Sequence, residues 1–172
     1  IQENHIRPIY KEEALYKVGV VLDKAADEDA QAKAFIRTVI KSRKEYKGSG
    51  SPTLFTTEDV LTSCLLLEDK NGRIIYDTVE KLATALRVKE IVTVEVMEGA
   101  KTKVEQQEKH LMALMVNLVD YYVRADKDGA VNMFDDFDKD YNQQKYLMET
   151  RCSGALVKPF SAIAVALDKA QG

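Results

Sequence analysis

The sequence predicts an α+β fold, with a mixed sheet flanked by helices and a long strand near the carboxy terminus. Residues 15–22 (LYKVGVVL) are rich in β-branched side chains, whereas apolar residues recur at helical spacing across residues 32–40. Residues 146–157 form a long β-leaning run, and a second apolar run follows at residues 161–167. The predicted strands and helices do not alternate regularly, which favours α+β over a doubly wound sheet.

The size and composition of the chain are those of one soluble globular domain. It has 172 residues, of which 45% are hydrophobic and 31% charged, and because Ile1 is not a start methionine we expect a processed chain or a fragment of a longer one. The net charge of -3 gives no general attraction to nucleic acid or to an anionic membrane. Cys64 and Cys152 belong to no CxxC pair, so we expect reduced thiols in a cytoplasm.

The helix around residues 32–40 is the clearest in the sequence. Acids at positions 27–29 suit the start of a helix, and the glycine- and proline-containing residues 48–52 end it. Its apolar side comprises Ala32, Phe35, Ile36, Val39 and Ile40. Its basic residues are Arg37, Lys41, Arg43, Lys44 and Lys47. We interpret them as spread around the helix, whereas a nucleic-acid site would have them on one stripe, so a solvated surface is favoured.

The middle of the chain predicts shorter elements. Residues 53–56 read as a strand, and Thr57 as the N-cap of a helix over residues 58–68. A turn at residues 69–72 and a second helix at residues 78–87 follow. Alternation predicts a strand at residues 90–97, and two further strands are expected at residues 111–118 and 121–124. The polar residues 98–109 and 127–142 are expected to form loops.

No constellation of residues indicates catalysis or a cofactor. Asp136, Asp138, Asp140 and Asn142 resemble a calcium loop, but the glycine and the terminal glutamate that such a loop needs are replaced by Tyr141 and Leu147. His5 and His110 lack the spacing of zinc ligands, and residues 47–51 lack the ending of a phosphate loop. No Ser or Cys has an adjacent His to activate it. We expect neither an enzyme nor a metal site.

Three blocks of the sequence, in this order, resemble the major capsid proteins of tailed bacteriophages, which have the Hong Kong 97-type capsid fold. The first is residues 52–76, and the second is Met115-Val116-Asn117-Leu118 with Asp120-Tyr121. The third contains Asp140-Tyr141-Asn142, Tyr146-Leu147, Glu149-Thr150-Arg151, Ser153-Gly154-Ala155-Leu156, Lys158-Pro159 and Ser161-Ala162-Ile163.

The resemblance implies a structural subunit of a phage or prophage capsid. Such subunits assemble in the bacterial host cytoplasm into pentamers and hexamers that enclose double-stranded DNA, and they are then part of the virion. The partners would be other capsid subunits, with scaffold or portal proteins besides; packaged DNA would be contacted only indirectly, and a membrane not at all. Two alternatives stay open: an encapsulin-like nanocompartment shell protein, and a small α+β ligand-binding domain.

The resemblance also divides the chain into regions. Residues 15–128 and 158–172 would form an axial-type domain, and residues 129–157 a strand region extending toward a peripheral domain. Candidate subunit-contact residues are Asp136, Asp138, Asp140, Glu149, Arg151, Lys101 and Lys103. Some family members link subunits through an asparagine aided by a glutamate, positions that correspond to Asn142 and Glu149. The lysine partner is not recognisable, so we predict no cross-link.

Overall fold

A six-stranded mixed sheet forms the centre of the protein in a computed structural model, which describes residues 8–12, 17–22, 28–125, 132–138, 140–149 and 152–167. Five strands lie side by side in the order β1 (Lys17–Leu22), β10 (Ala162–Leu167), β5 (Gln107–Val116), β2 (Thr53–Thr56) and β3 (Ile91–Thr93). The sixth, β4 (Lys101–Val104), pairs with β5 outside this row. β1 and β10 run parallel, as do β2 and β3, whereas β5 is antiparallel to its neighbours β10 and β2. The predicted α+β class is confirmed.

Both faces of the sheet are covered, which explains the apolar run in β10. Ile163 and Val165 pack toward one face with the residues of three helices, whereas Ala162 and Ala164 belong to a smaller cluster on the other face. All four side chains are fully buried. A strand that is buried on both sides is expected to be apolar throughout rather than alternating.

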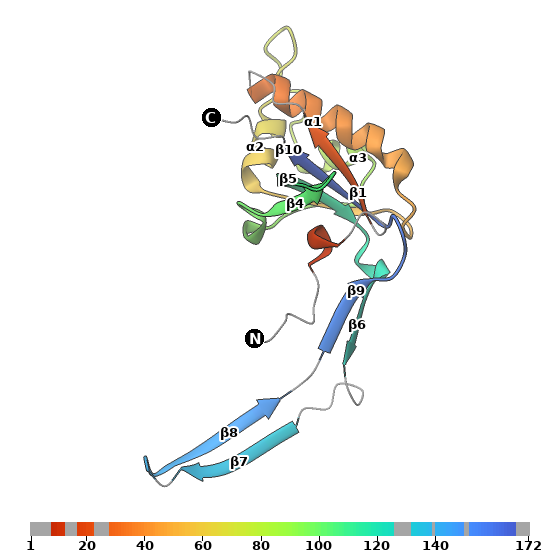
Figure 1. Cartoon of the computed structure of the whole chain (residues 1–172). Helices are drawn as coiled ribbons and strands as arrows, with labels where there is room; N and C mark the ends of the chain where they lie inside the picture. The colour runs from red at the N-terminus through yellow and green to blue at the C-terminus, as the bar shows by residue number, and fades with distance from the viewer. Residues whose placement is uncertain are drawn as a thin grey trace.

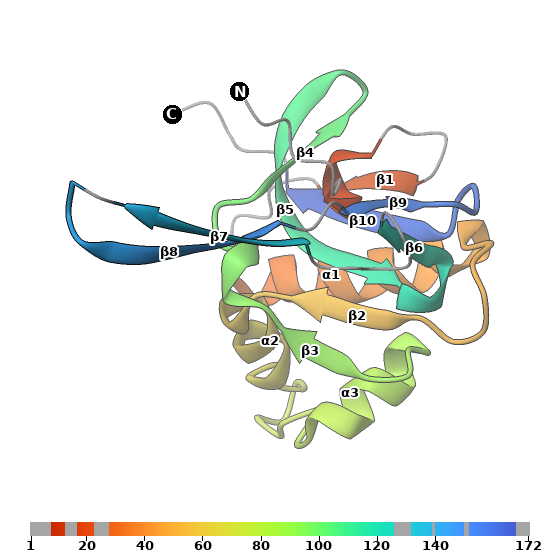
Figure 2. The same cartoon turned by 90° about the horizontal axis from the view of Figure 1, so that it is seen from below.

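Three helices cover one face of the sheet (Figures 1 and 2). They are α1 (Glu28–Ser42), α2 (Glu58–Leu65) and α3 (Val79–Leu86). The helical periodicity predicted for α1 is confirmed, since Phe35 and Val39 are buried against the sheet. α2 is shorter than predicted, and Thr57 stands at its N-cap position without a side-chain hydrogen bond. In α3 the Thr78 hydroxyl accepts the cap bond from the Lys81 backbone amide at 3.3 Å.

Two stretches of the middle region differ from the sequence prediction. The strand expected at residues 90–97 is confined to β3, and a 3-10 turn (Glu95–Met97) follows, leaving Val96 exposed. The polar residues expected to form a loop instead make a hairpin, in which β4 (Lys101–Val104) pairs with the start of β5. Glu105 and Gln106 turn this hairpin with φ of 50° and 68°. Two residues at positive φ are typical of a tight hairpin turn.

A narrow β ribbon projects from one end of the six-stranded sheet and its helices (Figure 1). It consists of two two-stranded antiparallel sheets: β6 (Tyr121–Ala125) with β9 (Cys152–Leu156), and β7 (Asn132–Asp138) with β8 (Gln143–Glu149). The residues predicted as one long strand, 146–157, lie in β8 and β9, which pair with different partners; residues 150 and 151 between them lie outside the described residues. The acidic stretch expected to be a loop contributes β7.

Candidate functional site

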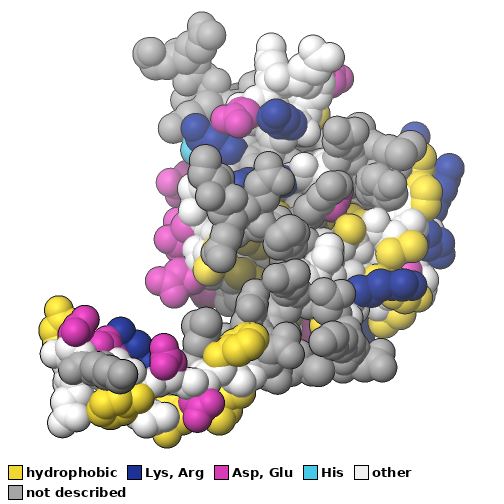
Figure 3. All heavy atoms as spheres, turned by 60° about the horizontal axis from the view of Figure 1, so that its bottom comes forward, with side chains coloured by type: hydrophobic (Ala, Val, Ile, Leu, Met, Phe, Trp, Pro, Cys, Tyr) yellow, Lys and Arg dark blue, Asp and Glu magenta, His cyan; other side chains and the backbone are white. Residues whose placement is uncertain are grey.

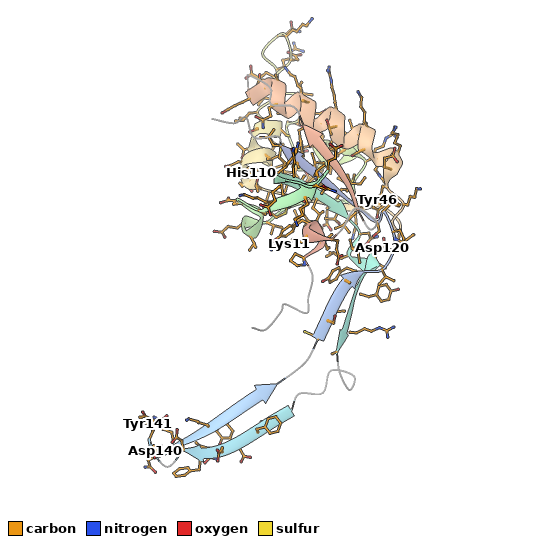
Figure 4. The ribbon with its side chains drawn as sticks, in the orientation of Figure 1. Lys11, Tyr46, His110, Asp120, Asp140 and Tyr141 are labelled. Atoms are coloured by element: carbon orange, nitrogen blue, oxygen red, sulfur yellow. The ribbon has the colours of Figure 1, made fainter. Side chains whose placement is uncertain are left out.

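The β7–β8 hairpin forms the far end of the ribbon and is the most exposed part of the described chain (Figures 1 and 4). Its register places Asp135 opposite Tyr146 and Phe137 opposite Gln144, so these residues share one face. Phe134 and Asp136, opposite Leu147 and Lys145, belong to the other face. A two-stranded hairpin is marginally stable at best when isolated in water. The described part of the chain provides no third strand to this sheet.

Large apolar side chains stand exposed on both faces of this hairpin and at its turn. Their exposed fractions lie between 47% and 73% for Met133, Phe134, Phe137, Tyr141 and Tyr146. Figure 3 shows hydrophobic and acidic side chains intermixed along it. Clusters of exposed large apolar side chains are typical of interaction surfaces. The hairpin is therefore the candidate contact surface of the described chain.

The acidic candidates lie along the same hairpin. Asp136 and Asp138 are on one face of β7, and Asp140 is in the turn. The Lys145 ammonium group forms an ion pair with Asp138 and holds the pKa of that carboxyl below its usual value. This pair is formed at neutral pH and is lost when acidification protonates Asp138. Asp136 is exposed and has no ion pair to another described residue.

The other candidates are placed differently. Lys101 and Lys103 alternate with buried residues on β4, so both ammonium groups are exposed on one side of that strand. They lie in the globular part of the protein, whereas Asp140 is at the far tip of the ribbon (Figure 4). Glu149 ends β8, and Arg151 lies outside the described residues, so their predicted pairing is untested. Asn142 occupies the hairpin turn with φ of 50°.

A buried carboxylate joins the ribbon to the globular part. Asp120, 5% exposed, directly precedes β6 and accepts hydrogen bonds from the Ser49 backbone amide at 2.7 Å and the Ser49 hydroxyl at 2.6 Å. The Asn117 amide and the Tyr46 hydroxyl donate to the Ser49 carbonyl at 2.8 and 3.1 Å. Figure 4 shows Tyr46 and Asp120 at the root of the ribbon. We call this group, with Tyr46, Ser49, Asn117 and Asp120, the joint.

The joint also contacts the returning strand. The Val157 backbone amide, immediately after β9, donates to the Asp120 carbonyl at 3.2 Å. The Lys47 amide donates to the Phe160 carbonyl at 2.9 Å, so residues 47–49 are hydrogen-bonded both to the segment before β6 and to the segment after β9. Burial, and then the nearby Asp120 carboxylate, raise the pKa of Tyr46. The glycine- and proline-containing residues 48–52 end the helix region as predicted, but their local pattern gives no sign of these contacts with Asp120.

The strands of the ribbon root approach each other closely at one glycine. Gly154 of β9 lies beside the Tyr121 ring, and a Cβ added there would stand 2.8 Å from the Tyr121 hydroxyl oxygen. Burial, and then the nearby Glu12 carboxylate, raise the pKa of Tyr121. Glu12 is itself buried, and its Oε1 has no hydrogen-bond partner among the described residues. Gly154 therefore permits the ring to cover the ribbon at its root.

The described residues contain little that resembles a catalytic or ligand site. No group of three or more His, Cys, Asp or Glu side chains among them has the geometry to hold a metal ion. A shallow depression between α1 and α2 has a volume of about 180 Å³, below the usual range for small-molecule pockets, and includes Phe35, Asp59 and Cys64 in its lining. None of the helices in the described ranges has the length and hydropathy of a membrane span.

Burial raises the pKa of the Cys64 thiol to about 12, so the reactive thiolate is scarce at neutral pH. We expect iodoacetamide to modify the partly exposed Cys152 of the native chain and to leave Cys64 unmodified. Peptide mass spectrometry after timed labelling measures both sites, and the urea-unfolded chain is the control in which both react. Equal labelling rates in the native chain contradict the prediction.

Comparison with known proteins supports the resemblance at the level of the fold. The mature capsid of bacteriophage PhiM1 matches with a TM-score of 0.55 and 14% identity, over 89% of this chain and 52% of that one. A phage-related protein from Bordetella bronchiseptica RB50 matches with a TM-score of 0.52 and 14% identity, over 92% and 58%. No protein-family model and no curated protein sequence matches the chain.

The chain thus has the fold of phage capsid proteins, as the sequence blocks indicated. It spans a little over half the length of these two structures. A chain from Gordonia phage Cozz also matches, with a TM-score of 0.50 and 13% identity, over 90% of this chain and 50% of that one.

Proposed function

We propose that this chain is part of a shell subunit of a phage or prophage capsid, a structural protein without catalytic activity. Copies assemble in the bacterial cytoplasm into pentamers and hexamers, which form an icosahedral head around double-stranded DNA. The single observation that carries the proposal is the phage capsid fold with its projecting ribbon. An isolated two-stranded ribbon is only marginally stable in water, and exposed apolar side chains are typical of interaction surfaces. Both properties favour a ribbon that is covered by neighbouring subunits.

We assign the two parts of the chain to the two domains expected of such subunits. The six-stranded sheet with its helices corresponds to the axial-type domain, and the ribbon extends toward the peripheral domain. In a ring of identical copies each contact joins two different patches of the same molecule. The hairpin and the β4 edge are two such patches, and they lie far apart within one chain (Figure 4).

Opposite charges support a contact between these two patches of neighbouring copies. Asp136 and Asp140 on the hairpin are exposed acids, and Lys101 and Lys103 on β4 are exposed bases. Complementary charges at a rim favour correct encounter and suppress wrong pairings. Asp136 is the best test position because Asp138 is already paired with Lys145 within its own chain.

We expect Asp136→Lys to reduce shell assembly about tenfold in the complete protein, since about 1.4 kcal/mol lost per contact corresponds to a factor of ten. Assembly is measured by expressing the complete protein in bacteria and counting shells by electron microscopy after gradient sedimentation. Lys103→Asp is expected to reduce assembly similarly, and the double variant Asp136→Lys with Lys103→Asp to restore it.

The matched control is Glu80→Lys, which makes the same charge change at an exposed position of α3. Normal shells from both single variants, or no recovery in the double variant, refute this charge contact. A complete protein that forms no rings or shells in any condition refutes the capsid function itself.

A further inference from the structure

A row of basic side chains follows the outer side of α1 and the 3-10 turn (Arg43–Glu45) after it. Lys33, Arg37, Lys41 and Lys44 are all exposed and follow one another at spacings of four, four and three residues. With 3.6 residues per turn, this spacing keeps Lys33, Arg37 and Lys41 on one face of α1, and Lys44 follows in the 3-10 turn. We call these four residues the basic stripe. The sequence interpretation that the bases are spread around the helix is corrected for these residues.

The basic stripe is largely unneutralised within its own chain. The acids of α1, Glu28 and Asp29, are both in the first turn, and none follows as far as Ser42. Among the described residues, no carboxylate is within ion-pair distance of Lys33, Arg37 or Lys41, whereas Lys44 contacts Glu45 at 3.4 Å. Figure 4 shows nitrogen-tipped side chains that project from α1 away from the sheet.

The positive surface continues beyond the end of the helix. The Arg43 guanidinium lies 4.7 Å from the centre of the Tyr46 ring, and the Lys47 ammonium 5.4 Å from that of Phe160. Cation–π contacts of this kind hold the charges in place without cancelling them. Lys158, two residues before Phe160, is also exposed. A surface with a local excess of positive charge attracts polyanions.

Two polyanions fit this charge: nucleic acid, and the acidic hairpin of a second copy. The hairpin is the poorer fit because exposed aromatic residues, including Phe134, Phe137 and Tyr141, stand among its acids and need an apolar partner. Among the described residues of α1, Ile40 is the large apolar side chain that is exposed, at 41%. A phosphate backbone needs only the charges, with no apolar contact.

We propose that the basic stripe binds the phosphate backbone of double-stranded DNA without regard to sequence. Lys33 and Lys41 are about 12 Å apart along the helix axis, a length over which duplex DNA carries several phosphates. Each ammonium or guanidinium group displaces condensed counterions from the DNA. The inference goes beyond assembly of the shell and does not depend on it, because it concerns the isolated chain.

The test is equilibrium binding of the 172-residue chain to a fluorescent 20-base-pair DNA duplex between 50 and 200 mM salt. Four phosphate contacts are expected to give a plot of log K against log salt concentration with a slope of about -3.6. In the triple variant Lys33→Gln, Arg37→Gln and Lys41→Gln only Lys44 remains, so the slope is expected to become shallower, about -0.9. The affinity of this variant at 50 mM salt is expected to fall at least about tenfold. Changing the duplex sequence is expected to leave both unchanged.

The matched control removes the same charge elsewhere, at the exposed residues Lys70, Arg73 and Lys89. This control is expected to retain nearly the wild-type slope and affinity, and circular dichroism checks that both variants remain folded. Equal losses in the two triple variants, or no salt-dependent binding by the unmodified chain, overturn the proposal. Loss of self-association in the stripe variant, with DNA binding intact, assigns the stripe to a second copy instead.

Discussion

Asp120→Ala is expected to lower the free energy of unfolding by about 3 kcal/mol, because hydrogen bonds to a buried charged group contribute about 1.5–3 kcal/mol each. The substitution removes the acceptor of both Ser49 donors and leaves the Ser49 amide without its partner. Urea unfolding followed by circular dichroism measures the loss, with an expected decrease in melting temperature of about 6–12 °C.

The control for this prediction is Asp77→Ala, which removes an aspartate that pairs with Lys81 at 2.6 Å on the surface. Both partners are more than half exposed, so water replaces the lost contact and the effect is expected to be much smaller. Equal destabilisation by the two substitutions means that the joint is not a stabilising centre. In the complete protein, Asp120→Ala is further expected to reduce assembly, because the joint sets the direction of the ribbon.

Phe35→Ala is expected to destabilise the chain by about 3–5 kcal/mol, the usual cost of a cavity left by a deleted buried aromatic ring. Phe35 is 2% exposed and packs in the main cluster between the helices and the sheet. Total stabilities of single domains are about 5–15 kcal/mol, so much of the native stability is lost. The midpoint of urea unfolding measures the effect at an unchanged slope.

Ile40→Ala provides the comparison within the same helix. Ile40 is 41% exposed, although the sequence analysis placed it on the apolar side, and its truncation is expected to cost less than about 1 kcal/mol. A loss at Ile40 that equals the loss at Phe35 contradicts the assignment of the buried face of α1. Both variants keep the four charges of the basic stripe, so DNA binding by the folded fraction is expected to remain.

The sequence by itself determined the elements whose pattern is local. The periodicity of Phe35, Ile36 and Val39 predicted α1 and its buried face, and the apolar run noted at residues 161–167 coincides with the buried strand β10. The spacing of Lys33, Arg37, Lys41 and Lys44 already contained the basic stripe, since a helix phase is enough to place them on one face. Arg43 and Lys47 follow the end of α1 and do not share this face. Grouping them with the other basic residues concealed the basic stripe.

The tertiary structure alone decided the ribbon, the β4–β5 hairpin and the joint. Lys101 and Lys103 were assigned to a loop because short polar strands differ little from loops in composition, and β4 is stabilised by its pairing with β5. Likewise, strand pairing made β7 from an acidic segment and separated β8 from β9. Ser49 and Asp120 are 71 residues apart in the sequence, and no local pattern relates them. Periodicity records which side of an element is buried, whereas hydrogen bonds between distant residues depend on how the whole chain folds.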